Sequence, residues 1–367
     1  PRPRPRSRGM SVRHIRSLGF EAPNEPYFAG YDEHPPHPGE LRIATTYSGF
    51  SAGTELTFMK GTNPYLRSRW DEERRIFVPG EAGMHYPVPF VGYMEVGTVI
   101  EGEARGVPTG ATVAGAWGHK SGHVIAPGRD RFFVLPDGID PMLGIYVGQM
   151  GPIAANGLLY ADHELAGAGC AQLGSSLAGR PVLVFGAGIV GFFTALFAQR
   201  AGASEVVIAD PSPFRRLRAE TLGLTAMPEA EAVDYAKSRW KGADLVFQTR
   251  AGGESLHNAM KALRPHGCVI DLAFYQGGSE AVRLGEEFHH NWLSIRCAQI
   301  GRVPPGMERL WDHERLGRET IALLAERGEA IRQQLVTHVV PIDEAPAFLR
   351  ALVKERPEFI QIVFAFA

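Results

Sequence analysis

The feature that most constrains the fold is a glycine-rich turn, Gly-Ala-Gly-Ile-Val-Gly, at residues 186–191. It follows a short, fully apolar segment (182–185) and opens a segment (189–200) that is apolar on nearly all sides. In a G-x-G-x-x-G turn the three glycines permit a tight turn, a close approach to a pyrophosphate and close helix–strand packing. The first N–H groups of the helix then face the phosphates. The dinucleotide-binding residues predicted by this motif are Gly186, Gly188, Ile189, Val190 and Gly191.

A carboxylate, Asp210, closes the next apolar segment (206–209), 19 residues after Gly191. A carboxylate at this place can accept both ribose hydroxyls of an adenosine and would repel a 2′-phosphate, which favours NAD over NADP. Arg215 and Arg216 follow within six residues and could reduce the repulsion of a 2′-phosphate. Asp210 could instead cap the following helix.

Apolar strand and helix patterns alternate from residue 181 to about residue 273, with further strands expected at 244–248 and 268–273. This alternation predicts an α/β fold with a doubly wound parallel sheet. Before it, residues 40–60 predict a strand, a Gly/Ser turn and a short helix that starts near Thr54. With further glycine-punctuated strands at 88–101 and 111–126, they indicate a partly open β-barrel or sandwich, and 141–160 predict a linking helix. The last strand, 359–364, could return to the first domain.

Composition narrows the class of protein. A length of 367 residues favours two domains. The net charge of −2 gives no support for a nucleic-acid or membrane partner. Three cysteines exclude a four-cysteine zinc site and a disulfide framework. Without an apolar run of about 18 residues or a signal peptide, we expect a cytoplasmic protein. Residues 1–10 are interpreted as a disordered or cloning-derived leader, with a basic interaction arm as the alternative.

Two stretches of the first domain carry a family resemblance. Residues 48–55, SGFSAGTE, match a stretch that usually reads G-I-C-G-T-D, and residues 91–99, VGYMEVGTV, match one that reads G-H-E-x-x-G. From about residue 38 the chain thus resembles a medium-chain dehydrogenase/reductase. The resemblance implies a GroES-like catalytic domain (11–155 and 300–367), a Rossmann NAD-binding domain (156–299) and a homodimer. The S-G-x-S-x-G-T-E and G-Y variants are similar to the bacteriochlorophyllide-dehydrogenase-type branch, which oxidises a secondary alcohol.

The departures from the family pattern concern zinc. In zinc-dependent members a Cys, a His and a later Cys or Glu bind the metal, whereas Ala52 and Tyr93 stand at the first two positions here. Gln149 and Met150 occupy the region of the third ligand. Because a catalytic zinc site needs three Cys, His or carboxylate ligands, we expect no zinc.

Without zinc, a side chain must exchange the hydroxyl proton during hydride transfer. The resemblance places Thr54 at the family's hydroxyl relay, Glu55 at its acidic residue beside the site and Tyr93 where the ligand His would face the substrate. His123 is a candidate base and His119 a candidate substrate contact on the strand that lines the cleft in relatives. Each could instead be structural: Tyr93 packed, Thr54 a helix cap, and His123 an ordinary strand residue.

Other candidate contacts lie later in the chain. The backbone at Ala273 and Phe274, after a strand, could meet the nicotinamide carboxamide. The substrate candidates that the interdomain loop of relatives suggests are His289, His290 and Asn291. An aromatic and arginine-rich insertion, residues 61–87, could cover the cleft or form a solvated helix.

The sequence therefore predicts a zinc-independent, NAD-dependent oxidoreductase that interconverts a secondary alcohol and a ketone. The insertion favours a polar ring substrate such as a sugar, cyclitol or glycoside. The alternatives are an NADPH-dependent quinone or enone reductase, an enzyme that recycles tightly bound NAD, and a cofactor-binding sensor without turnover.

Overall fold

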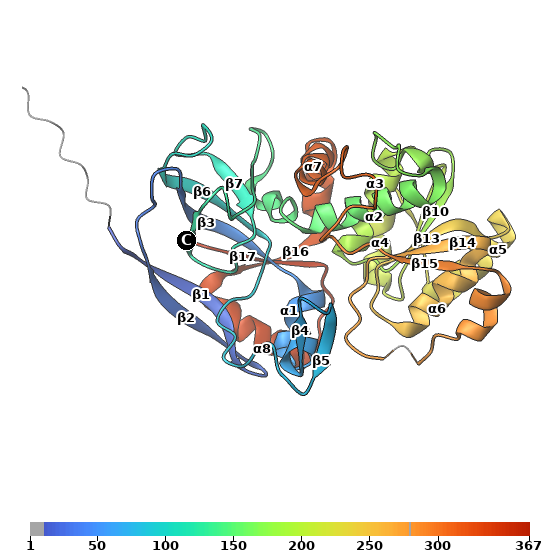
Figure 1. Ribbon diagram of the computed structural model, residues 1–367, viewed down its shortest axis with the longest axis horizontal. Helices are drawn as coiled ribbons and strands as arrows, with labels where there is room; N and C mark the ends of the chain where they lie inside the picture. The colour runs from blue at the N-terminus through green and yellow to red at the C-terminus, as the bar shows by residue number, and fades with distance from the viewer. Residues whose placement is uncertain (1–10, 279) are drawn as a thin grey trace, which may run out of the picture.

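The computed structural model describes residues 11–278 and 280–367. The leader predicted for residues 1–10 lies outside the described residues. Two halves lie side by side in Figure 1, a β-rich half and a half with a helix-covered sheet, with α2 (Met150–Ala166) and α7 (His313–Leu335) at their junction. Within the described part of the chain, no helix is both long enough and apolar enough to cross a membrane.

The second half is built on a six-stranded parallel sheet in the order β12-β11-β10-β13-β14-β15. Its strands are β10 (Pro181–Phe185), β11 (Glu205–Ala209), β12 (Thr225–Met227), β13 (Ala243–Gln248), β14 (Leu263–Asp271) and β15 (Ser294–Cys297). The helices between them are α3 (Ile189–Arg200), α4 (Pro213–Thr221), α5 (Glu229–Trp240) and α6 (Gly253–Ala262). This is the doubly wound sheet that the sequence predicted, with its order reversing between β10 and β13.

Both faces of this sheet are covered, so its central strands are apolar on both sides. Val182 and Val184 of β10 pack into the core that includes residues of α2, α3 and α7. The alternate residues Leu183 and Phe185 pack into a separate core with residues of α5 and α6. The short apolar run before the glycine turn is therefore explained by burial on two faces.

The β-rich half contains a sheet of order β16-β17-β3-β6-β7-β9, with β8 also paired to β3. Its strands are β3 (Leu41–Phe50), β6 (Glu95–Gly102), β7 (Thr112–Gly115), β8 (Gly122–Ile125), β9 (Phe132–Val134), β16 (Val336–Pro341) and β17 (Gln361–Ala365). β17 pairs antiparallel with β3, with Ile362 opposite Phe50. The last strand thus returns to the first domain, as the sequence suggested.

Shorter elements complete the fold: α1 (Ala52–Met59), α8 (Ala345–Glu355), the 3-10 turns η1 (Pro64–Leu66), η2 (Pro141–Tyr146), η3 (Ser175–Leu177) and η5 (Ile342–Glu344), and the π-turn η4 (Leu284–Phe288). The predicted linking helix begins later, at Met150, because 141–146 form η2. The predicted domain boundary at residue 155 falls inside α2, whose residues pack into the core that spans both halves. The exact boundaries stay a prediction.

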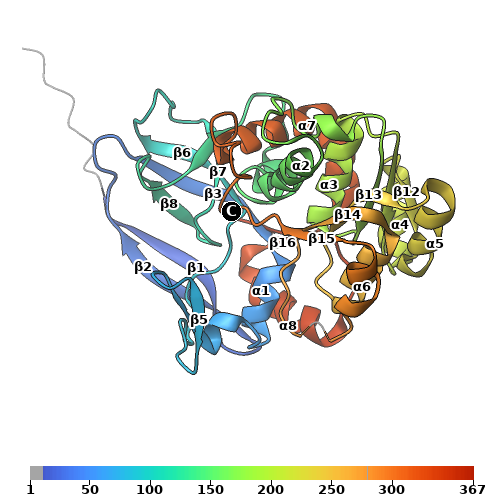
Figure 2. The same cartoon turned by 45° about the vertical axis from the view of Figure 1, so that its right-hand side comes forward.

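Two antiparallel hairpins were not predicted. β1 (Arg13–Ala22) pairs with β2 (Glu25–Glu33), and β4 (Ser68–Asp71) pairs with β5 (Ile76–Pro79). The second hairpin lies in the 61–87 insertion, so the solvated helix considered for this segment is wrong. Phe77 makes edge contacts with Tyr65 and Trp70 across the hairpin, which explains the aromatic residues there. Figure 2 shows β5 at the outer side of α1, away from the central sheet.

Candidate active site

The glycine turn joins β10 to α3 with the geometry that dinucleotide binding requires. Gly186 has a φ of +100°, a left-handed conformation that favours glycine. A Cβ atom on Gly191 would lie 1.8 Å from the carbonyl oxygen of Gly186, so no larger residue fits this turn. Gly188 is the N-cap residue of α3, and no side chain accepts a hydrogen bond from the first N–H groups of this helix at that position. The first N–H groups of α3 are therefore free to meet a phosphate.

Asp210 is buried at the carboxyl end of β11, where it supports the same turn. Its Oδ2 accepts the N–H of Ala187 at 2.8 Å and its Oδ1 accepts the N–H of Ser212 at 2.9 Å. A cavity of about 320 Å³ opens beside it, lined by Gly186, Gly188, Asp210, Pro211, Ser212, Arg215, Thr249 and Arg250. A carboxylate has about four acceptor positions, so two remain for the hydroxyls of a ribose. The helix-cap alternative is wrong for Asp210, because Ser212 caps α4.

Arg215 and Arg216 have different surroundings. Arg215 lines the Asp210 cavity and the neighbouring cleft, and donates to the carbonyl oxygens of Ala187 at 3.3 Å and Phe359 at 2.9 Å. It therefore connects the glycine turn to the last segment of the β-rich half. Arg216 donates instead to the carbonyl oxygens of Asp210 and Pro211.

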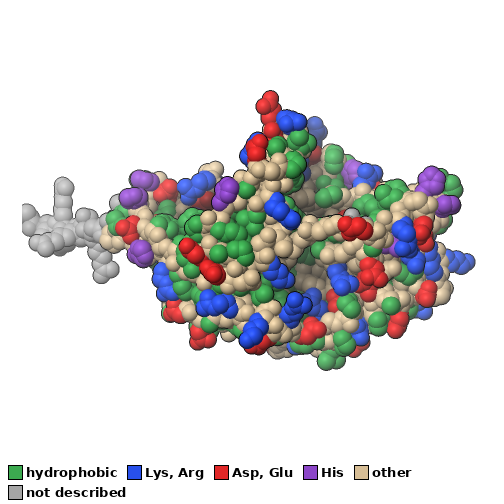
Figure 3. All heavy atoms as spheres, turned by 90° about the horizontal axis from the view of Figure 1, so that it is seen from below, with side chains coloured by type: hydrophobic (Ala, Val, Ile, Leu, Met, Phe, Trp, Pro, Cys, Tyr) green, Lys and Arg blue, Asp and Glu red, His purple; other side chains and the backbone are tan. Residues whose placement is uncertain are grey.

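A cleft of about 450 Å³ separates the two halves near α1. Figure 3 shows a deep hollow between the halves on the face seen from below. From the β-rich half it is lined by Phe50, Ser51, Ala52, Gly53, Thr54, Leu56, Tyr93, Phe359, Ile360 and Gln361. From α2 and the parallel sheet it is lined by Met150, Ile153, Gly188, Ile189, Val190, Arg215, Thr249, Ala251, Leu272, Ala273 and Phe274. The predicted residues Ala273 and Phe274 are therefore part of the cleft lining.

Three hydroxyl groups meet in this cleft. The Tyr93 hydroxyl is 3.1 Å from the Thr54 Oγ1 and also hydrogen-bonds the Ser51 Oγ. Ser51 is the N-cap residue of α1, but its side chain makes no cap hydrogen bond, which leaves its hydroxyl for Tyr93. Burial raises the pKa of Tyr93, although the hydrogen bonds from Ser51 and Thr54 act in the opposite direction. The phenol is therefore protonated at neutral pH and can donate to a ligand oxygen.

Comparison with known proteins agrees with this arrangement. The sequence model of the family described as zinc-binding dehydrogenase matches residues 190–310. D-guloside 3-dehydrogenase from Escherichia coli is 24% identical over 357 residues, which cover 94% of this chain and 97% of that protein. These matches agree with the resemblance to the medium-chain dehydrogenase/reductase superfamily. Galactitol-1-phosphate dehydrogenase from E. coli superposes with a TM-score of 0.71 at 16% identity, covering 95% of this chain and 99% of that one. L-idonate 5-dehydrogenase from E. coli superposes with a TM-score of 0.68 at 15% identity, covering 97% of this chain and 99% of that one.

The zinc positions of the superfamily hold other residues here. Ala52, Tyr93 and Met150 line the cleft, and among the described side chains that line it there is no Cys, His or carboxylate. Alanine offers no ligand atom, and a protonated phenol and a thioether are not the ligands that zinc prefers. The residues present therefore do not fit a catalytic zinc ion. The family match does not bear on this point, because residues 190–310 lie outside the ligand positions in the β-rich half.

Glu55 and His119 lie together, but below the cleft rather than in its lining. Both are buried, and the His119 Nε2 is 2.6 Å from the Glu55 Oε2. The other oxygen of Glu55 accepts the N–H of Ser51 at 2.8 Å. The prediction that His119 contacts substrate is wrong, since its side chain is fully enclosed.

His123 does not reach the cleft, so its prediction as a base is wrong. It lies on β8, with its Nε2 3.5 Å from Asp130, and its ring stacks on Trp117. Burial lowers its pKa to about 4, although Asp130 acts in the opposite direction. The surroundings of His119 and His123 differ because His119 lies in the loop before β8, whereas His123, four positions later, lies on β8 itself.

His289, His290 and Asn291 also do not reach the cleft. They lie between η4 and β15, at the amino end of that strand, and the Asn291 carbonyl oxygen accepts the N–H of His266 near the start of β14. The cofactor cleft is lined by residues 272–274, which follow the carboxyl end of β14. The prediction of a substrate or cofactor contact is therefore wrong, because parallel strands place these residues at the opposite end of the sheet.

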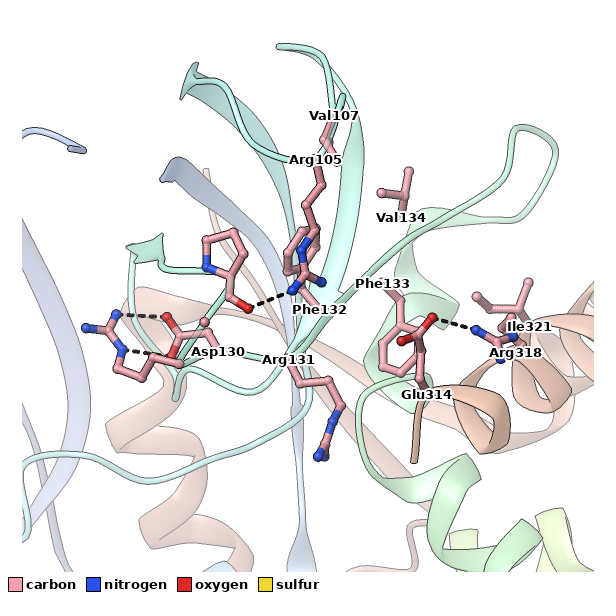
Figure 4. A pocket seen from close by; sticks show the side chains of 13 residues that line it. Arg105, Val107, Asp130, Arg131, Phe132, Phe133, Val134, Glu314, Arg318 and Ile321 are labelled. Atoms are coloured by element: carbon pink, nitrogen blue, oxygen red, sulfur yellow. Dashed lines mark hydrogen bonds and ion pairs between the residues drawn. The ribbon is translucent and has the colours of Figure 1, made fainter. Parts of the chain in front are cut away.

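A larger cavity, of about 510 Å³, lies on the β-rich half against α7. Arg129 donates to Asp130, and Arg105 donates to the carbonyl oxygen of Pro127. Figure 4 shows Arg318 paired with Glu314. Most of its arginines thus have protein partners, and the residues of the hydroxyl cluster and glycine turn lie elsewhere. We do not assign this cavity to the active site.

Sequence reasoning missed several residues that complete the site. Ser51 was given no role from the sequence, yet its hydroxyl hydrogen-bonds that of Tyr93. Thr249, at the end of β13, donates to the carbonyl oxygens of Phe185 and Gly186 and so supports the glycine turn. Its place directly after an apolar strand was the available signal. Ser48 and Glu95 lie within the two matched stretches but were given no role, and only the fold brings them to His119.

Proposed function

We propose that this chain catalyses NAD-dependent hydride transfer between a secondary alcohol and its ketone without a catalytic zinc ion. The observation that carries this proposal is the Tyr93–Ser51–Thr54 hydroxyl cluster in the cleft opposite the glycine turn. Such a cluster can hold an alcohol or carbonyl oxygen by hydrogen bonds at the place where zinc-dependent relatives hold it by the metal.

The cofactor would be held by the elements already described. The α3 N-terminus and Arg215 would meet the pyrophosphate, and Asp210 the adenosine ribose. Residues 272–274 would flank the nicotinamide, which supplies the hydride acceptor or donor when it is bound. Asp210 favours NAD over NADP, while Arg250 and Arg215 at the same cavity are the groups that could tolerate a 2′-phosphate.

Tyr93 would carry the proton of the reaction. In the direction of ketone reduction, the carbonyl carbon would accept the hydride of the reduced nicotinamide, while the protonated Tyr93 hydroxyl donates its proton to the carbonyl oxygen, which becomes the alcohol hydroxyl. Ser51 and Thr54 hold the phenol oxygen in place, and their hydroxyl groups can relay a proton from water to restore the phenol. In alcohol oxidation the same proton moves in reverse, which requires the phenolate and so favours higher pH.

A polar ring is the substrate class we propose: a sugar, cyclitol or glycoside. The support is the resemblance over nearly the full length to D-guloside 3-dehydrogenase, together with folds shared with dehydrogenases of galactitol 1-phosphate and L-idonate. The β4–β5 hairpin contributes no residue to the cleft lining, so its role over the substrate stays a prediction. The expected homodimer is likewise a proposal.

The test is an absorbance assay of nicotinamide reduction. The purified chain is given NAD⁺ or NADP⁺ with glycosides, free sugars, polyols and cyclitols, and in parallel NADH or NADPH with quinones and enones. We expect NAD⁺ reduction by a ring alcohol, with a higher kcat/KM for NAD⁺ than for NADP⁺. Consumption of NADPH by an enone or quinone, with no alcohol oxidised, would contradict the proposal and favour the reductase alternative.

A further inference from the structure

Three buried ionisable side chains lie directly beneath the hydroxyl cluster. Glu55, Glu95 and His119 are each at most 1% exposed, and they come from α1, β6 and the loop before β8. The His119 ring is packed against Phe50 and Phe364. Burying charged groups in apolar surroundings costs free energy unless they are paired. The presence of three such side chains together therefore indicates that they have a role at this place.

His119 uses both ring nitrogens. Its Nε2 is 2.6 Å from Glu55 Oε2, and its Nδ1 hydrogen-bonds the Ser48 hydroxyl on β3. Burial opposes a charge on the ring, but Glu55 and then Glu95 raise its pKa above the usual value. This shift favours the protonated ring, in which each nitrogen can donate to its oxygen partner, Glu55 on one side and Ser48 on the other.

This ring is connected to both partners of the Tyr93 hydrogen bond. Through Glu55, it reaches Ser51, because the second oxygen of Glu55 accepts the Ser51 N–H at 2.8 Å. It also packs against Gly92, the residue before Tyr93. A Cβ atom on Gly92 would lie 3.0 Å from the His119 Nε2 and 2.9 Å from the Glu95 Oε1. The same buried ring is therefore connected to the backbone of Ser51 through Glu55, and it contacts the backbone at Gly92 directly.

We propose that His119 is a positioning residue for the Tyr93 phenol, acting through Glu55 on Ser51 and through contact with the backbone at Gly92. It touches neither the cleft nor a ligand in it. The inference rests on the proposed function, and it explains why a chain without zinc ligands keeps a buried charge network below the reacting groups. Glu95 completes the network, with its Oε2 accepting the N–H of Trp117 at 2.7 Å.

The test compares His119→Gln with two other variants. Glutamine keeps one N–H for Glu55 but loses the positive charge and the bond to Ser48. We expect kcat to fall by about 10-fold to 100-fold, as for other misplacements of a reacting group, with KM for cofactor and alcohol changed by no more than about 2-fold. His123→Gln, on the following strand, is the matched control and should keep wild-type kcat. Ser48→Ala removes only the second partner of the ring and should give a smaller fall in kcat, which keeps the test available if His119→Gln does not fold.

A second readout does not need turnover. The alkaline ultraviolet titration of the protein minus that of a Tyr93→Phe variant isolates the Tyr93 phenol. Without the protonated ring, Glu55 and Glu95 both raise the pKa of Tyr93 and lose their buried partner. Lys120, which interacts with Glu95, and Arg215, which lines the cleft, remain, and the titration should move to higher pH. A purely structural His119 would lower the melting temperature while leaving kcat and this titration unchanged, and that result would overturn the proposal. An inactive wild type with a shifted titration would instead refute only the proposed function.

Discussion

Replacing Tyr93 with phenylalanine removes one oxygen atom from the centre of the candidate site. The ring remains, while the hydrogen bonds to Ser51 and Thr54 are lost. Both partners line the cleft, but Ser51 is only 2% exposed, so the loss in folding free energy should be about 1 to 3 kcal/mol, the cost of leaving a buried hydroxyl without a partner. The variant should therefore fold, and its kinetics can be interpreted.

The effect on turnover should be larger than the effect on stability. Proton transfer by a positioned side chain contributes roughly 100-fold to 10,000-fold. With Ser51 and Thr54 still present to hold the ligand oxygen weakly, we expect kcat to fall by about 100-fold or more in both directions. The KM for the cofactor should change by about 2-fold or less, because Tyr93 lies at the hydroxyl cluster rather than at the Asp210 cavity.

Initial rates at saturating cofactor, measured by nicotinamide absorbance, provide the comparison. Tyr86→Phe is the matched control, because the Tyr86 hydroxyl bonds only the carbonyl oxygen of Phe58 and lies outside the cleft lining. It should keep wild-type kcat. If Tyr93→Phe retained more than about a third of the wild-type kcat, a change too small for loss of a general acid, the role of Tyr93 as proton carrier would be refuted.

Three further predictions concern the cofactor site and the buried network. Asp210→Ala removes the acceptor of the Ala187 and Ser212 N–H groups. The ratio of kcat/KM for NAD⁺ to that for NADP⁺ should fall by at least about tenfold, which is the equivalent of one charge-assisted hydrogen bond. An unchanged ratio would contradict the proposed role of Asp210. Gly191→Ala places a Cβ atom 1.8 Å from the Gly186 carbonyl oxygen and should raise the NADH dissociation constant about tenfold or more in a fluorescence titration, whereas wild-type affinity would show that the turn is not the binding site. Glu95→Gln should become more stable relative to wild type as pH rises from 5 to 8. Burial raises the pKa of Glu95 from 4.5 to about 7, so the wild type loses stability as the pH rises through that interval. A pKa difference of two units corresponds to about 3 kcal/mol of unfolding free energy. Urea unfolding of the variant and the wild type measures this change, and a stability difference between them that does not vary from pH 5 to pH 8 would contradict the prediction.

The second half of the fold could be predicted because its signals are local. The apolar run before Gly186, the glycine spacing and Asp210 all lie within 30 residues, and each is dictated by a strand buried on two faces followed by a phosphate-facing helix. The same is true of the hydroxyl residues Thr54 and Tyr93, whose motifs mark their places in the family.

One incorrect site prediction concerned residues whose distance from the cleft depends on which end of a strand they adjoin. The segment 289–291 was expected in the interdomain loop, but it precedes β15 (294–297), so its side chains lie at the end of the sheet away from the cleft. The sequence pattern around β15 is short and weakly apolar, and it does not distinguish the two ends. The β4–β5 hairpin was similarly obscured, because its aromatic residues pack on one another across the strands rather than on the core.

The buried network lay beyond local reasoning altogether. Glu55 and His119 are 64 residues apart, and Ser48 and His119 are 71 apart. Only the antiparallel arrangement of β3 with β6 and β8 brings the segments that carry them together. A single histidine in a glycine-rich stretch offered no means of choosing between a substrate contact, a base and a buried ion-pair partner.

The central claim is that the hydroxyl cluster, rather than a metal ion, holds the reacting oxygen. The most direct measurement is turnover of NAD⁺ with a ring alcohol by protein dialysed exhaustively against a zinc chelator, with metal content determined by elemental analysis on the same sample. We predict wild-type kcat at less than about 0.1 zinc per chain, and no increase when zinc is restored, since the cleft offers no set of three Cys, His or carboxylate ligands among its described residues. Activity that disappears with the chelator and returns in proportion to added zinc would contradict the account.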